Sequence, residues 1–132
     1  MKTAGWGRIV NISSYSVRQP MDNMMLSNSL RLSVLGWAKT LANEVAPHGI
    51  LVNTVCPGWT NTHRVASLLE SRSAAEGITT EEAREMISKN VPLGRLAEAD
   101  EIANMVVFLA SNAASYVTGV AVPVDGGISR VV

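Results

Sequence analysis

The sequence has little of several residue types that particular functions require. Cys56 is its single cysteine, which excludes an internal disulfide and a structural zinc site built on cysteines. Aromatic residues make up only 5% of the chain, so there is no stacking platform for single-stranded nucleic acid. Its two histidines and scattered acidic residues show no metal-ligand spacing, and we expect no metal site.

A net charge and long apolar runs are lacking as well. Eleven Lys and Arg residues balance eleven Asp and Glu residues, which disfavours nucleic acid or an anionic membrane as a partner. No apolar run approaches the ~20 residues of a membrane span, and no signal-peptide pattern follows Met1. We therefore expect no nucleic-acid partner, no membrane partner and a cytoplasmic location.

What is present indicates a globular α/β chain, because 47% of the residues are hydrophobic and 17% are charged. Short β-branched runs predict strands at residues 7–13, 50–56 and 119–124. Helical spacing and capping signals, among them Thr79 with Glu82 as a capping box, predict helices at residues 23–45, 64–72, 80–89 and 97–111. Long helices between short apolar strands imply right-handed crossovers and a three-stranded parallel sheet.

Three stretches together resemble the C-terminal half of the short-chain dehydrogenase/reductase family. They are GRIVNISS (7–14), KTLANEVAPHGILVNTVCPGWTNT (39–62) and PLGRLAEADEIANMVVFLASNAASYVTGVAVPVDGG (92–127). The resemblance implies the last three strands of a doubly wound Rossmann sheet with flanking helices. The family's Gly-rich turn, which seats the cofactor pyrophosphate, has no counterpart in the sequence. We expect residues 1–132 to form a single truncated Rossmann-like domain without that phosphate-binding half.

The resemblance also assigns catalytic positions. Ser14 occupies the position of the serine that polarises the substrate carbonyl. Ser27, thirteen residues later, replaces the family's tyrosine, and Arg31, four further on, replaces its lysine. A serine hydroxyl is far less acidic than a phenol, so proton transfer should be impaired. Alternatively, Ser14 only caps the end of its strand, and Tyr15 beside it is a conceivable substitute phenol.

Cofactor-binding positions follow in the same way. Pro57, Gly58, Thr60 and Thr62 match the segment that meets the nicotinamide and phosphate in the family, and Arg31 matches the ribose contact. The implied cofactor is NAD or NADP, and the implied substrate is a small carbonyl compound or alcohol. The alternative is a strand-end turn that supplies helix N-caps.

Three functions therefore stay open. The chain is an oxidoreductase by lineage, a cofactor-free structural remnant, or a serine hydrolase that uses His63 with Ser14 or Ser27. Because four strands of the family's sheet are missing, we also expect the chain to associate with itself. The interface would be the edge of strand 7–13 or the face of helix 23–45, since open edges and apolar faces are usually covered.

Overall fold

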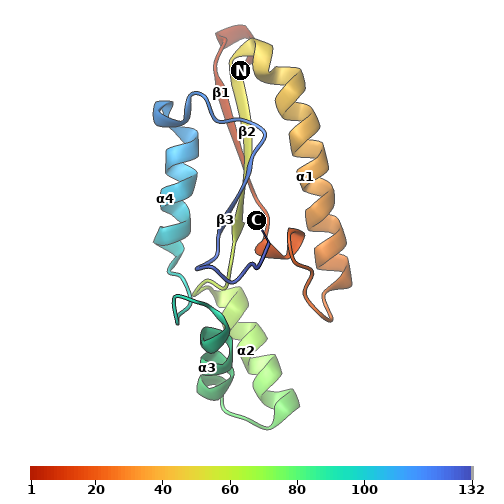
Figure 1. Cartoon of the computed structure of the whole chain (residues 1–132), viewed down its shortest axis with the longest axis vertical. Helices are drawn as coiled ribbons and strands as arrows, with labels where there is room; N and C mark the ends of the chain where they lie inside the picture. Colours follow the sequence, from red (N-terminus) through yellow and green to blue (C-terminus); the bar gives the residue numbers. More distant parts are fainter. Residues whose placement is uncertain (132) are drawn as a thin grey trace.

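The computed structural model describes residues 1–131 and contains one parallel sheet. Its strands β1 (Gly7–Ile12), β2 (Ile50–Pro57) and β3 (Ala121–Val124) lie side by side in that order. The long helices are α1 (Met25–Val45), α2 (His63–Glu76), α3 (Thr80–Asn90) and α4 (Ala99–Ala110). The predicted fold class and parallel pairing are confirmed (Figure 1).

Strand β2 forms the centre of the sheet. It pairs in parallel with β1, with Gly7 opposite Ile50, and with β3, with Thr54 opposite Ala121. Five consecutive residues from Val52 to Cys56 are buried, as expected for a strand covered on both faces. Buried and exposed residues therefore do not alternate along β2, because both of its faces are covered.

The two faces of the sheet have separate cores, because successive strand side chains point to opposite sides. On one face, Val52 packs with Ala38 and Ala42 of α1. On the other face, Val55 packs with Ile102 and Leu109 of α4. Figure 1 shows α1 and α4 on opposite sides of the strands.

Helices α2 and α3 form a third cluster beyond the carboxyl ends of the strands (Figure 1). Leu69 of α2 packs on Ala83 and Ile87 of α3. Thr79 and Glu82 make the predicted capping box at the start of α3. Helix α2 of this pair contributes to the wall of the site described below.

Some boundaries differ from the predictions for local reasons. Helix α1 begins at Met25 rather than residue 23, because Asn23 has a positive φ of 59° that ends the preceding turn. Strand β3 begins at Ala121 rather than residue 119, since Gly119 has φ 70°. The predicted loop after β1 contains a short 3₁₀ turn, Tyr15–Val17.

Candidate active site

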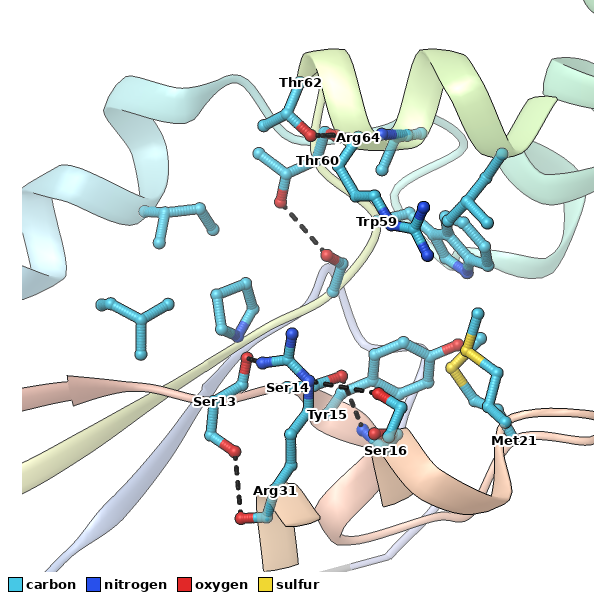
Figure 2. A pocket seen from close by; sticks show the side chains of 18 of the residues that line it. Ser13, Ser14, Tyr15, Ser16, Met21, Arg31, Trp59, Thr60, Thr62 and Arg64 are labelled. Carbon is cyan, nitrogen blue, oxygen red and sulfur yellow. Dashed lines mark hydrogen bonds between the residues drawn. The ribbon is translucent and has the colours of Figure 1, made fainter. Parts of the chain in front are cut away.

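A cavity of about 870 Å³ lies at the carboxyl ends of β1 and β2 (Figure 2). In open α/β sheets, ligands bind in the crevice at the carboxyl ends of the strands. The start of α1, the start of α2 and one face of α4 contribute to its walls. All the residues predicted for catalysis or cofactor binding line it: Ser14, Ser27, Arg31, Pro57, Gly58, Thr60 and Thr62.

Ser27 and Arg31 form a hydrogen-bonded pair on one turn of α1. Arg31 Nε donates to Ser27 Oγ at 3.2 Å, and Arg31 Nη1 donates to the Ser13 carbonyl at 2.6 Å. In return, Ser13 Oγ donates to the Arg31 carbonyl at 3.4 Å. The guanidinium thus ties α1 to the end of β1 and is held at the cavity (Figure 2).

Ser14 has a structural contact as well as a place in the cavity wall. Its Oγ accepts a hydrogen bond from the Ser16 amide at 3.1 Å and so caps the 3₁₀ turn. The neighbouring Ser16 side chain is buried, and its Oγ has no hydrogen-bond partner within residues 1–131. Ser14 therefore caps the 3₁₀ turn, as the alternative interpretation predicted, and it also lines the cavity.

Tyr15 is the only phenol that lines the described cavity. Burial raises its pKa above the ordinary value of a phenol. A hydrogen bond from Trp59 acts in the opposite direction, and the charge of Asp125 adds a smaller upward effect. A phenol with a raised pKa holds its proton at neutral pH, so Tyr15 is poorly suited to act as a general base.

The residues after β2 mainly build their own turn. The Gly58 amide donates to the Val124 carbonyl at 3.0 Å, and a Cβ on Gly58 would lie 2.7 Å from the Asp125 Cα. Thr60 Oγ1 donates to the Gly58 carbonyl at 3.1 Å. Thr62 is the N-cap of α2 and accepts from the Val65 amide. Both threonines therefore have local hydrogen bonds in addition to their positions in the wall.

His63 does not join either serine. It is the first residue of α2, is exposed and is not among the residues that line the cavity. Within residues 1–131, no hydrogen bond links it to Ser14 or Ser27. The Ser–His arrangement that a hydrolase requires is therefore not formed in the described chain.

Several lining residues were missed by the sequence interpretation. Trp59 and Arg64 flank the predicted cofactor segment, and Met21, Met24 and Met25 come from the stretch that leads into α1. The only local signal was their closeness in sequence to Thr62 and Ser27. They reach one cavity because the loop after β1 and the start of α2 meet above the sheet.

Metal ligands, the single cysteine and membrane-spanning helices were the remaining features to place in the described residues. No group of three or more His, Cys, Asp or Glu residues within residues 1–131 has an arrangement suited to a metal ion. Cys56 is buried beneath the site, and burial raises the pKa of its thiol. None of the described helices is both long and apolar enough to cross a membrane.

The fold and the site together define a doubly wound α/β protein with its ligand crevice at the carboxyl ends of parallel strands. A family model described as enoyl-(acyl carrier protein) reductase matches residues 1–129. The chain belongs to the short-chain dehydrogenase/reductase family, and its lineage is that of the family's oxidoreductases.

Individual relatives agree with this assignment. The chain is 41% identical over 130 residues to a 3-oxoacyl-[acyl-carrier-protein] reductase of Pseudomonas aeruginosa, covering 97% of this chain and 47% of the relative. L-sorbose reductase of Gluconobacter frateurii, solved with NADPH and L-sorbose, superposes with a TM-score of 0.93 at 29% identity, covering 100% of this chain and 51% of that one.

A third relative has an unusual site. A short-chain oxidoreductase of Pseudomonas aeruginosa PAO1, solved with NADPH and described as containing an atypical catalytic centre, superposes with a TM-score of 0.80 at 30% identity. The match covers 95% of this chain and 47% of that one. The chain spans about half the length of the curated relatives that it matches.

The cofactor implied by the family is NAD or NADP, as the NADPH-bound neighbours illustrate. The described residues suit the nicotinamide half of such a molecule, because Pro57, Gly58 and Arg31 line one cavity of sufficient size. They do not fit the phosphate half, since residues 1–131 supply no Gly-rich turn.

Proposed function

We propose that the chain carries the nicotinamide and substrate side of an oxidoreductase site that acts on a small carbonyl compound or alcohol. The convergence of Ser14, Ser27 and Arg31 on one cavity with the Pro57–Gly58 turn supports this function. The cofactor would supply or accept a hydride when bound. The protein's own residues would orient the carbonyl and move the proton.

Each polar residue has a distinct task in this proposal. Ser14 Oγ would donate a hydrogen bond to the substrate carbonyl oxygen while it still accepts from the Ser16 amide. Ser27 would stand where the proton is transferred, with Arg31 Nε already donating to its oxygen. A nearby guanidinium stabilises an alkoxide but does not bring an aliphatic hydroxyl to neutral pKa, so the proton-transfer step should be slow.

The first experiment measures cofactor binding and turnover in parallel. NADH and NADPH are titrated by calorimetry into the protein and into Arg31→Ala, which removes the guanidinium. We expect weak binding of at least one nucleotide and loss of that binding in the variant. Absence of binding at millimolar nucleotide would overturn the proposal for this chain.

The second experiment restores the missing chemistry. A double variant, Ser27→Tyr with Arg31→Lys, introduces a phenol and an ammonium at the same turn of α1. We expect it to raise NADPH-dependent reduction of a small ketone by ~10²–10⁴-fold over the unmodified chain, the usual contribution of a general acid–base group. An unchanged rate with the nucleotide bound would contradict the proposed proton path.

A second candidate is a cofactor-free structural remnant that associates with itself. The exposed apolar side chains along α1 favour self-association. The hydroxyl groups of Thr60 and Thr62 already have hydrogen-bond partners within the chain, so neither needs a ligand as a partner. A serine hydrolase is not proposed, because His63 does not line the cavity. A cytoplasmic location remains a prediction from the sequence.

A further inference from the structure

Among the described residues, two arginines and no acidic residue line the cavity, although Asp125 lies near enough for its charge to act on Tyr15 of the wall. Arg31 lines it from α1 and Arg64 from α2 (Figure 2), and no Asp or Glu is among the described residues of its walls. The ion pairs within residues 1–131 are Arg72–Glu76, Lys89–Glu85 and Arg95–Glu101. Neither cavity arginine belongs to one of them. Arg31 already donates to Ser27 and to the Ser13 carbonyl, whereas Arg64 makes no side-chain hydrogen bond within residues 1–131 and is available to an anion.

Arg64 also occupies an electrostatically unfavourable place on its helix. It is the second residue of α2, where the positive end of the helix dipole disfavours a cation, and the first turn contains no acidic residue. By contrast, α3 and α4 begin with acidic residues, as the dipole favours. An anion bound between the guanidinium and the helix end would offset this repulsion.

The rest of the wall is mostly apolar. Methionine side chains are flexible and adapt to apolar ligands of varied shape. The apolar lining residues are Ile12, Met21, Met24, Met25, Leu26, Trp59, Val65, Leu68, Ile102 and Val106. The volume of about 870 Å³ lies within the range of small-molecule sites.

We propose that this cavity binds a monocarboxylate with an apolar chain. The carboxylate is bound by Arg64, whose planar fork matches two carboxylate oxygens, and the chain lies against the methionines and Trp59. This inference narrows the substrate of the proposed oxidoreductase site to a carbonyl compound or alcohol that also has a carboxylate and an apolar chain, and its catalytic meaning rests on that function. The binding itself requires no hydride transfer.

Octanoate is a suitable probe, and 1-octanol and methyl octanoate are its neutral counterparts. In calorimetric titrations at low salt, we expect octanoate to bind the unmodified protein at least tenfold more tightly than either neutral probe. Raising the salt concentration should weaken octanoate but not octanol, because screening acts on the charge. Equal affinity for the neutral probes, or no octanoate binding at millimolar concentration, would overturn the inference.

Two matched variants on α2 locate the carboxylate. Arg64→Gln removes the cavity guanidinium and should weaken octanoate at least tenfold while leaving octanol unchanged. Arg72→Gln removes an arginine that is paired with Glu76 and does not line the cavity, and it should leave both probes unchanged. Circular dichroism checks that each variant is folded. Equal octanoate affinity in Arg64→Gln and Arg72→Gln would contradict the assignment.

The outcome is separable from that of the proposed function. Octanoate binding without nucleotide binding supports this inference and overturns the oxidoreductase proposal. Nucleotide binding without octanoate binding supports the oxidoreductase proposal and overturns this inference. The same protein samples serve both titrations.

Discussion

Gly58 and Gly36 have different surroundings at the scale of single residues. A Cβ on Gly58 would lie 2.7 Å from the Asp125 Cα and 3.0 Å from its carbonyl oxygen, which are backbone atoms that move only with the loop. A Cβ on Gly36, in the middle of α1, would meet no atom within 4 Å. The first glycine is required by the close approach of two chain segments, and the second is not.

Alanine at these positions should therefore have opposite effects. Gly58→Ala is expected to lower the free energy of unfolding by about 1–3 kcal/mol through overpacking. Gly36→Ala should raise it by about 0.5–1 kcal/mol, since alanine is the better helix former. Urea unfolding followed by circular dichroism measures both. A Gly58→Ala variant as stable as the unmodified chain would contradict this expectation and show that the loop at Asp125 moves away at little cost in free energy.

The Ser27–Arg31 pair illustrates what spacing alone can predict. Residues four apart on a helix lie on one face, and the 3.2 Å hydrogen bond between Arg31 Nε and Ser27 Oγ agrees with that expectation. The bond from Arg31 Nη1 to the Ser13 carbonyl was not predictable. It depends on how α1 returns past the end of β1, which no local pattern encodes.

At the scale of secondary-structure elements, α4 begins with a charged cluster that responds to pH. Arg95 donates to both carboxylate oxygens of Glu101 at 2.7 Å, and the Glu98 amide donates to one of them. The hydrogen bonds from Arg95 come first and that from Glu98 second in lowering the pKa of Glu101 to about 2. The folded protein therefore binds this proton less readily than the unfolded chain does.

The sign of the pH dependence follows from the lowered pKa. The stabilisation is complete above the unfolded value near 4.5 and is lost as the pH falls toward 2. We expect the stability difference between the unmodified protein and Glu101→Gln to shrink over this interval. Urea unfolding at pH 6, 4 and 2.5 measures it.

Glu85→Gln provides a matched control, because Glu85 makes one exposed contact with Lys89 at 3.4 Å. Its effect on stability should be smaller at every pH than that of Glu101→Gln. If the two variants had the same pH profile, the Arg95–Glu101 pair would not contribute measurably to stability.

At the scale of the whole molecule, the chain exposes more surface than a compact protein of its mass. Its accessible surface is 8078 Å² for 14.1 kDa. A folded monomer of this mass has about 6,700 Å² on average. The apolar side chains Leu30 and Trp37 of α1, which do not line the cavity, account for part of the exposure.

We predict that a second copy of the chain covers this face of α1. Leu30→Lys places a charge in the middle of the face and should shift the protein toward the monomer in sedimentation velocity at micromolar concentration. Tyr116→Lys, at a fully exposed position outside α1, is the control and should leave the distribution unchanged. A monodisperse monomer before any substitution would contradict the prediction.

Local sequence determined the elements of this protein and placed Ser27 and Arg31 on one turn of a helix. Helical periodicity, capping residues and β-branched runs depend on neighbours a few residues apart, so the strands, the capping box at Thr79 and the positions of Ser27 and Arg31 were predictable. Tertiary structure alone decided the cavity. Trp59 and Arg64 reach it from the segment that leads from β2 into α2, and the methionines reach it from the segment that leads into α1. Contacts between such distant segments leave no period in the sequence.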